Sequence, residues 1–255
     1  MSDAVRVVRE GAVARILLDR GAKRNAFTCA MWARLADLLD AAAAMDLRLL
    51  RLESAAAGVF SAGADLAEFA AMADDRELRR AGRDRMRRAL DMLAAFPRPT
   101  LAVISGPCMG AGLALAAACD LRIADATARF AVPPAKLGLL YMQSDLARLV
   151  ALVGVAETKR LVFTARTIDA AEALRIGLVE ERVAAGELAD AAERLSAEII
   201  SGAPASIAAM KTFIARAAAG KGEDAASLEA FLAAYDSPEF AAGLAAFRRR
   251  RRGSS

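Results

Sequence analysis

Residues 103–120, VISGPCMGAGLALAAACD, constrain the fold more than any other stretch of this chain. The β-branched run at its start predicts a strand, and Gly106-Pro107 predicts a tight turn after it. Gly110 and Gly112 then open a segment made almost entirely of Ala and Leu, which predicts a buried helix. A strand, a turn and a buried helix in this order are typical of an α/β protein.

The two glycines stand where the first turn of that helix is expected. N–H groups in a first helical turn lack intrahelical partners and carry a partial positive charge, so this turn can stabilise an anion or an oxygen that becomes negative. Close packing is the alternative, because small residues let a helix lie tightly against its neighbours. A second glycine loop, VFSAGADL at 59–66, also precedes a predicted helix. If its N–H groups converge with that of Gly110, the two loops form an oxyanion hole.

The rest of the pattern predicts two regions. Residues 5–9 and 13–19 alternate apolar and polar side chains around Glu10-Gly11, which predicts a β-hairpin. Strands then alternate with helices, and helices alone follow in the last third of the chain, with separate helices expected near 144–153 and 156–163. We therefore expect a core over residues 1–195 and a helical C-terminal region over 196–255.

Composition excludes several kinds of chemistry. The 255 residues contain no histidine, which excludes Ser-His-Asp and Cys-His catalysis and histidine metal sites. The three cysteines have neither disulfide nor CxxC metal spacing, so no metal is expected. We find no apolar run of membrane-span length and no signal-peptide pattern at the N-terminus, and we therefore predict a cytoplasmic protein without membrane contact.

Charge gives little reason to expect a nucleic-acid partner. The net charge is +4, concentrated in residues 76–88 and 248–252. Phe247 is the only aromatic residue near the arginine tail, so a solvated helix end is favoured over nucleic-acid binding.

Four motifs in this order resemble the crotonase, or enoyl-CoA hydratase/isomerase, superfamily: FSAGADL at 60–66, SGPCMGAGLALAAACDLRIAD at 105–125, ARFAVPPAKLGL at 128–139 and AEALRIGLVEERV at 171–183. The resemblance implies a spiral of ββα units with a helical C-terminal trimerisation region, assembled as a homotrimer or a hexamer. It also implies a lyase or isomerase of fatty acid metabolism that acts on acyl-CoA thioesters and has no tightly bound cofactor.

The resemblance further assigns site residues. The N–H groups of Ala64 and Gly110 would stabilise a thioester enolate. Asp65 is equally well explained as a helix cap, and Phe247 and Arg250 as ordinary surface residues. The positions that match coenzyme A contacts in the family are Lys23, Arg24, Ala26, Ala62, Asp65, Leu66, Phe247 and Arg250.

The chain departs from the family's hydratases at both catalytic glutamates. Ala114 and Pro134 stand at those positions, and neither side chain can carry a proton, so the two-glutamate hydration mechanism cannot operate. Tyr141, three residues after Gly138, matches a tyrosine of the family's decarboxylases of malonyl-type thioesters. Loss of CO2 forms the enolate without a base. Tyr141 either binds the substrate carboxylate or lines the pocket with its hydroxyl bonded to the backbone.

Three other residues near the site remain candidates. Glu68 and Asp145 are more simply explained as capping or solvated carboxylates, and Cys108 as a small buried side chain. The alternatives to decarboxylation are a hydratase or isomerase that uses another carboxylate, and an acyl-CoA binder without catalysis.

Overall fold

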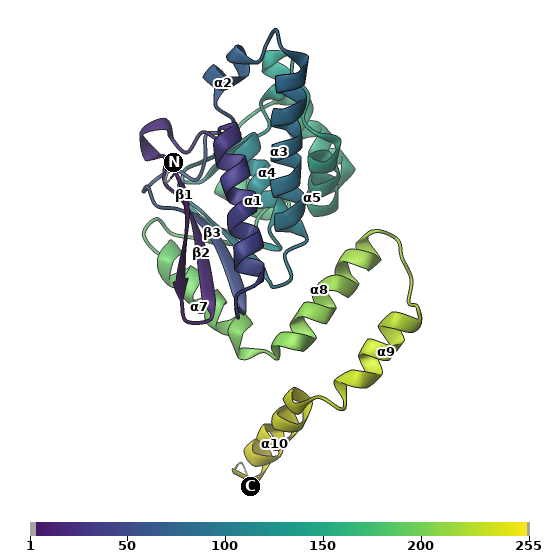
Figure 1. The fold of residues 1–255 in the computed structure, drawn as a ribbon. Helices are drawn as coiled ribbons and strands as arrows, with labels where there is room; N and C mark the ends of the chain where they lie inside the picture. Colours follow the sequence, from purple (N-terminus) through teal and green to yellow (C-terminus); the bar gives the residue numbers. More distant parts are fainter. Residues whose placement is uncertain (1–3, 254–255) are drawn as a thin grey trace. The chain divides into compact units, whose positions relative to one another are not determined.

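The computed structural model describes residues 4–253, with side chains described through Arg249. It divides into two compact units, residues 1–199 and residues 200–255. The first unit is built on a six-stranded sheet in the order β1-β2-β3-β4-β6-β9. Figure 1 labels the first three of these strands. Its strands are β1 (Val5–Glu10), β2 (Val13–Leu18), β3 (Leu49–Ser54), β4 (Thr100–Ile104), β6 (Leu121–Asp125) and β9 (Glu181–Val183).

The predicted hairpin is present, since β1 and β2 pair antiparallel. Gly11 takes a φ of +61° in the turn between them, a conformation that glycine adopts without strain. The remaining pairs of the large sheet are parallel. All five residues of β4 are buried, as expected for a central strand covered on both faces.

A second, three-stranded sheet consists of β5 (Pro107–Met109), β7 (Arg129–Ala131) and β8 (Ile168–Asp169). The chain alternates between the two sheets. β4 and β6 belong to the large sheet, β5 and β7 to the small one, and a helix follows each pair. The expected ββα units are therefore present. β5 was not predicted because its residues were assigned to the turn before the buried helix, and β8 was not predicted because two residues are too few to show alternation.

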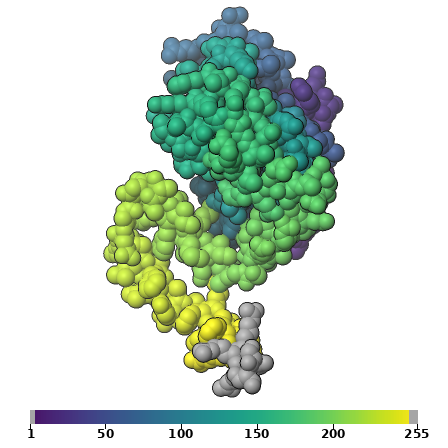
Figure 2. All heavy atoms as spheres, turned by 180° about the vertical axis from the view of Figure 1, so that it is seen from behind, coloured from purple at the N-terminus to yellow at the C-terminus, as the bar shows by residue number. Residues whose placement is uncertain are grey.

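Helices of the first unit pack next to one another as well as against the sheet. α1 contacts α3, α3 contacts α4, and α4 contacts α5 (Figure 1). The opposite view shows the face that contains α5 and α7, in teal and green (Figure 2). The helices are α1 (Cys29–Ala43), α2 (Leu66–Ala71), α3 (Arg76–Ala94), α4 (Ala111–Ala118), α5 (Gln143–Thr164), α6 (Ala170–Arg175) and α7 (Leu188–Ser201), with short 3₁₀ turns η1 (Gly21–Lys23) and η2 (Pro134–Leu137).

The two helices expected near 144–153 and 156–163 are the two halves of α5. Gly154 has a φ of +76° and a ψ of 170°, which are not helical values, so the helix is interrupted there. The second unit contains α8 (Pro204–Ala218), α9 (Ala225–Ala234) and α10 (Pro238–Gly253).

α4 is the predicted helix with the bare first turn, and all eight of its residues are buried. Arg122 of β6 holds its C-terminal end. This guanidinium is 1% exposed and donates to the carbonyls of Cys119 at 2.7 Å and Leu178 at 2.9 Å, besides pairing with Glu180. Because the cation binds carbonyls at the C-terminus of α4, it also complements the helix dipole. The N-terminus of α4 faces the site described next.

Candidate active site

Two loops converge at the N-terminus of α4. The loop that follows β3 pairs with β5, because the N–H of Met109 donates to Ser61 at 2.9 Å and the N–H of Ser61 donates to Pro107 at 2.8 Å. The same loop pairs with the early segment of the chain through Phe27, whose N–H donates to the Gly63 carbonyl at 2.7 Å. Main-chain bonds therefore fix Ala64 beside the start of α4.

Glycine is required at two contact points between these loops. A Cβ on Gly63 would lie 2.8 Å from the Met109 carbonyl oxygen and 3.6 Å from the Ala111 nitrogen. A Cβ on Gly112 would lie 2.8 Å from the Cβ of Ser61. Close packing thus accounts for these glycines. The same packing brings Gly63, the residue before Ala64, against the Ala111 nitrogen at the start of α4, so the two explanations left open by the sequence are compatible.

One N–H group of the predicted oxyanion hole, that of Gly110, has a hydrogen-bond partner within the protein. The N–H of Gly110 donates to the Ala131 carbonyl at 2.9 Å, because the parallel β5–β7 ladder continues one residue beyond β5. That N–H is therefore already bonded within the protein. Ala111 is the first residue of α4, and its N–H has no intrahelical partner. Within the part of the chain that the structure describes, neither Ala64 nor Ala111 donates its N–H to a protein acceptor.

The conformation of Gly110 explains why its own N–H is bonded to β7 while the N–H of Ala111 is not. Its φ of +50° and ψ of −112° turn the chain from β5 into α4, and they lie in a region that glycine tolerates and other residues avoid. The turn directs one N–H toward β7 and leaves the next N–H at the helix terminus. The sequence analysis assigned the donor to Gly110, whereas the N–H that lacks a partner at this turn is that of the next residue, Ala111.

Tyr141 lies at the same turn. Its hydroxyl donates to the Gly110 carbonyl at 2.9 Å, and that carbonyl also accepts from the Ala114 N–H at 3.0 Å. Of the two roles considered for Tyr141, this geometry is that of a pocket residue whose hydroxyl is bonded to the backbone. The Gly110 carbonyl and the Ala111 N–H belong to one planar peptide, so the tyrosine bond orients and polarises this donor.

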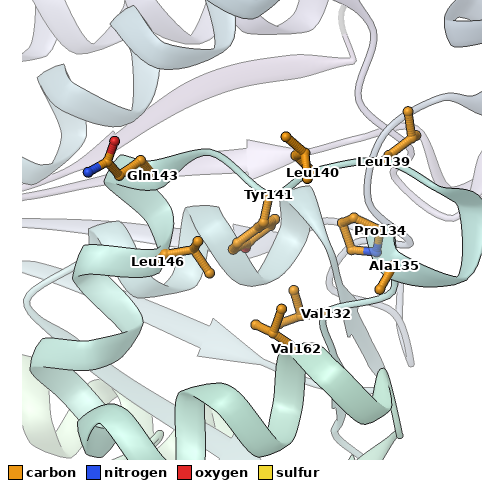
Figure 3. Close-up of a pocket in the computed structure, with 9 residues that line it drawn as sticks. All are labelled: Val132, Pro134, Ala135, Leu139, Leu140, Tyr141, Gln143, Leu146 and Val162. Carbon is orange, nitrogen blue, oxygen red and sulfur yellow. The ribbon is translucent and has the colours of Figure 1, made fainter.

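A pocket of about 260 Å³ adjoins this turn (Figure 3). Figure 3 shows the Tyr141 ring among apolar side chains, with Gln143 at the start of α5. Pro134 lines the pocket, and Ala114 is fully buried in α4. Neither of these side chains can ionise. The lining residues are Val132, Pro134, Ala135, Leu139, Leu140, Tyr141, Gln143, Leu146 and Val162.

Asp145, which the sequence analysis explained as a capping or solvated carboxylate, is fully buried. Its side chain is 0% exposed, and its Oδ1 accepts from the Arg148 guanidinium at 2.9 Å. Its Oδ2 is buried without a hydrogen-bond partner. Burial raises the pKa of this carboxyl to about 6, Asp91 adds to the increase, and Arg148 opposes it. No cap bond from Asp145 to the start of α5 is found among the described residues.

Glu68 has a structural role. Its Oε2 accepts from the Cys29 N–H at 2.6 Å, so the carboxylate of α2 caps the N-terminus of α1. The remaining candidate, Cys108, is fully buried, and burial raises the pKa of its thiol well above the usual range. A neutral buried thiol is a poor nucleophile, in agreement with the interpretation of Cys108 as a packing residue.

The predicted coenzyme A residues of the first unit lie around the two loops. Ala62 donates its N–H to the Arg24 carbonyl at 2.8 Å, and Ala26 donates to the Lys23 carbonyl at 3.0 Å. The side chains of Lys23 and Arg24 are exposed, as is that of Leu66. The structure thus places these residues near Ala64.

Asp65 caps α2 through the N–H of Ala67 at 3.0 Å and pairs with Arg20 at 2.7 Å. This ion pair lowers the pKa of the Asp65 carboxyl. Phe247 is an exposed residue of α10, in the second unit. Arg250 lies outside the residues whose side chains the structure describes.

Sequence reasoning missed the buried polar residues that hold the loops. Asn25 is fully buried, and its amide donates to Ser54 at 2.7 Å and to the Phe60 carbonyl at 3.0 Å. The Ser61 hydroxyl donates to the Asn25 carbonyl at 2.7 Å. Asn25 has a φ of +51°, a conformation in which asparagine is enriched. The sequence signal was Arg24-Asn25, a turn-forming pair directly after η1.

Residues 8–253 match the family model described as enoyl-CoA hydratase/isomerase. The chain belongs to this family. A mouse relative, the mitochondrial enoyl-CoA hydratase domain-containing protein 2, is 37% identical over 254 residues, covering 94% of this chain and 82% of its own length. A solved enoyl-CoA hydratase/isomerase family protein from Hyphomonas neptunium has a TM-score of 0.93 and 34% identity, covering 97% of this chain and 95% of that chain.

A solved enoyl-CoA hydratase/carnithine racemase from Magnetospirillum magneticum has a TM-score of 0.94 and 33% identity, covering 98% of this chain and 94% of that chain. These similarities confirm the superfamily and the crotonase fold predicted from the four motifs. They also support an enzyme of the enoyl-CoA hydratase/isomerase family at that level of description.

The cytoplasmic location predicted from the sequence is corrected by the same relatives. The mouse, cattle and human proteins are mitochondrial by name. The prediction rested on a missing secretory pattern, and such an absence does not specify a compartment. Among the described residues, no helix combines the length and apolarity needed to cross a bilayer. The described residues also contain no group of three or more His, Cys, Asp or Glu side chains arranged to bind a metal ion.

Proposed function

We propose that this protein acts on acyl-CoA thioesters and stabilises a thioester enolate with the N–H groups of Ala64 and Ala111. The observation that carries the proposal is the pair of unbonded N–H groups at the junction of the loops and α4. Both belong to a rigid main chain, and the Ala111 donor benefits from the positive end of the helix dipole. Such donors stabilise negative charge as it develops on a carbonyl oxygen.

The specific reaction that we propose is decarboxylation of a malonyl-type CoA thioester. Hydration requires an acid and a base at the two positions that Ala114 and Pro134 occupy. Loss of CO2 leaves its electron pair on the α-carbon and forms the enolate directly, so no base is needed. A pocket whose lining contains no carboxylate also avoids repulsion of the substrate carboxylate.

We propose that the protein binds its substrate through the coenzyme A moiety and uses no tightly bound cofactor. Lys23 and Arg24 are exposed cations beside the Ala64 loop and suit the phosphates of coenzyme A. Replacing both by Ala should raise KM with little change in kcat, because phosphate contacts bind the ground state and the transition state alike. Lys159→Ala, at an exposed lysine of α5, is the control and should leave KM unchanged.

A panel of thioesters tests the reaction. Malonyl-CoA, methylmalonyl-CoA, ethylmalonyl-CoA, crotonyl-CoA and a 3-enoyl-CoA are incubated with the enzyme, and products are identified by mass spectrometry. Loss of CO2 from a malonyl-type ester supports the proposal. Water addition to crotonyl-CoA, or migration of the 3-enoyl double bond, contradicts decarboxylation and favours another carboxylate as the base. Tight binding of every ester without turnover identifies an acyl-CoA binder.

A further inference from the structure

The pocket beside the first turn of α4 offers a ligand almost only apolar surface. Of the described residues that line it, only Tyr141 and Gln143 have polar side chains, and none is charged. The Tyr141 hydroxyl is already bonded to the Gly110 carbonyl. Such a surface is stabilised when an apolar group covers it, and it provides no partner for a charged group. The pocket therefore suits an alkyl group.

The pocket lies next to the turn that carries the proposed donors. Val132 of the lining follows Ala131, whose carbonyl accepts the Gly110 N–H at 2.9 Å. Pro133, between two lining residues, has its Cδ 3.6 Å from the place of a Cβ on Gly110. A thioester carbonyl held at the start of α4 would therefore have its acyl group beside the pocket.

The size of the pocket indicates how large this acyl group is. Its volume is about 260 Å³, the space of roughly eight or nine water molecules at about 30 Å³ each. Since a methylene group is similar in size to a water molecule, an alkyl chain of several carbons fits. Leu139 and Leu140 of the lining are 47% and 95% exposed and add further apolar surface. Malonyl thioesters with an alkyl group on the α-carbon match this space better than malonyl-CoA itself.

Tyr141 belongs to both the pocket and the turn. Figure 3 shows its ring among the apolar side chains of the lining. Its hydroxyl donates to the Gly110 carbonyl at 2.9 Å, and this carbonyl shares one planar peptide with the N–H of Ala111. One side chain thus joins the site of the acyl group to the peptide that would stabilise the enolate oxygen.

The main chain around Tyr141 does little to hold the ring in place. Residues 138–142, between η2 and α5, form neither helix nor strand. Within the described part of the chain, the N–H groups of Leu140 and Tyr141 donate no main-chain hydrogen bond. The position of the ring therefore depends on side-chain packing and on the hydroxyl bond. An alkyl group in the pocket adds packing contacts to the ring and narrows its motion.

We propose that Tyr141 is a positioning residue that couples an alkyl acyl group in the pocket to the N–H donor of Ala111. The inference rests on the proposed oxyanion hole and names alkyl-substituted thioesters as its substrates. A filled pocket holds the ring, and the hydroxyl bond then orients and polarises the Gly110–Ala111 peptide. The donor meets the developing charge in a fixed geometry, so the binding energy of the alkyl group raises kcat.

Saturated thioesters test the coupling without any decarboxylation, because they have no carboxylate to lose. Propionyl-, butyryl-, hexanoyl- and octanoyl-CoA, labelled with ¹³C at the thioester carbonyl, are bound to the enzyme. The downfield NMR shift of that carbon measures how strongly the donors polarise the carbonyl, and calorimetry gives the Kd of each ester. Tyr141→Phe is compared with the wild type. Tyr235→Phe is the matched control, because it removes the hydroxyl of an exposed tyrosine in the second unit.

In the wild type, Kd should fall about fourfold with each added methylene until the pocket is full. The downfield shift should increase over the same range of chain lengths. In Tyr141→Phe, Kd should keep this dependence because the ring remains, whereas the shift should be smaller and equal for all chains. Tyr235→Phe should behave as the wild type. A shift that depends on chain length in Tyr141→Phe, or does not depend on it in the wild type, overturns the coupling.

Val162 tests whether the alkyl group occupies this pocket. It is a half-buried lining residue of α5. Val162→Phe should narrow the pocket and end the gain in Kd at a shorter chain, and Val162→Ala should extend it to a longer one. Val155→Phe, at a 53% exposed position of the same helix, is the control. If Val162→Phe does not fold, Val162→Ala decides alone. An unchanged limit of chain length in Val162→Ala contradicts the assignment of the pocket.

Turnover of alkylmalonyl esters distinguishes this inference from the proposed decarboxylation. With methyl-, ethyl- and butylmalonyl-CoA, kcat for CO2 loss should rise with alkyl length in the wild type. In Tyr141→Phe it should be constant and about three- to tenfold lower, the usual effect of one hydrogen bond. Equal kcat values for all esters in the wild type overturn the coupling and leave decarboxylation in place. A chain-dependent carbonyl shift without CO2 loss from any ester supports the coupling and contradicts decarboxylation.

Discussion

Most substitutions change the side chain and leave the backbone N–H donor in place. Proline is the exception, because it has no backbone N–H. Ala111 is the first residue of α4, a position where proline fits the helix and deprives it of no intrahelical bond. Ala111→Pro should therefore fold and lower kcat by about 10²- to 10³-fold, the usual cost of one oxyanion donor. Steady-state kinetics on the substrate found in the panel measure this loss. An unchanged kcat contradicts the assignment of Ala111.

Gly110→Pro provides the contrast. The N–H of Gly110 bonds to Ala131, and its φ is +50°, which proline cannot adopt. This substitution should lower the thermal stability before any effect on catalysis can be measured. A folded Gly110→Pro enzyme with lost activity would instead favour the original assignment of the Gly110 donor.

Asp145 should make stability depend on pH with a predictable sign. Its pKa is about 6 in the folded protein and 3.8 in the reference state, so the folded state binds the proton more tightly. The resulting stabilisation is fully present below pH 3.8 and is lost as the pH rises through about 6. It amounts to about 3 kcal/mol, since one pKa unit corresponds to about 1.4 kcal/mol.

Chemical denaturation at several pH values checks this dependence. The difference in the free energy of unfolding between the wild type and Asp145→Asn should shift in favour of the wild type as the pH falls from 8 toward 4. A difference that stays constant over this interval contradicts the raised pKa of the Asp145 carboxyl.

At the scale of elements, the site depends on how closely α4 approaches the loop before α2. Gly112 lies against Ser61, where a Cβ would come within 2.8 Å of main-chain and side-chain atoms. Gly112→Ala should push the loop and α4 apart and separate the N–H groups of Ala64 and Ala111. We expect a loss of about 1–3 kcal/mol of stability, typical of overpacking, and a lower kcat.

Thermal unfolding and kinetics of Gly112→Ala measure these effects, with Gly222→Ala as the control. A Cβ at Gly222 meets no atom within 4 Å, so the control should behave as the wild type. An active and fully stable Gly112→Ala enzyme shows that the loops can separate without consequence.

Most elements of the fold could be predicted from the sequence, because each is long enough to show a clear periodicity of apolar residues. The hairpin, the central strands and the helices all appear where periodicity placed them, with α5 interrupted at Gly154. The donor at Ala111 could not be predicted, because it depends on a three-residue strand that continues its pairing to Gly110. The buried Asp145 pairs with Arg148, which also pairs with Asp91 of α3, and one-dimensional periodicity does not contain such contacts between elements.

At the scale of the whole molecule, the second unit displays many apolar side chains. Ile214 is 69% exposed, Phe231 55% and Tyr235 57%. Apolar side chains at this density are typical of association surfaces. We propose, as the family resemblance implies, that copies of the chain assemble as a homotrimer or a hexamer through this region.

Sedimentation should yield a mass of three or six chains, and Phe231→Ser should shift it toward the monomer. Lys221→Ser, an exposed position of the same unit, should leave the mass unchanged. A monomeric wild-type protein contradicts the proposed assembly.

The two donors proposed for the enolate are main-chain atoms, held by other main-chain atoms. Their geometry does not depend on which side chains surround the acyl group, provided that the glycines and buried polar anchors of the loops are retained. Evolution can therefore replace the side chains that act as acids and bases while it preserves the N–H groups that stabilise negative charge. A lineage can lose glutamates, pass through a catalytically poor ancestor that still binds thioesters, and acquire a new reaction on an old anion site.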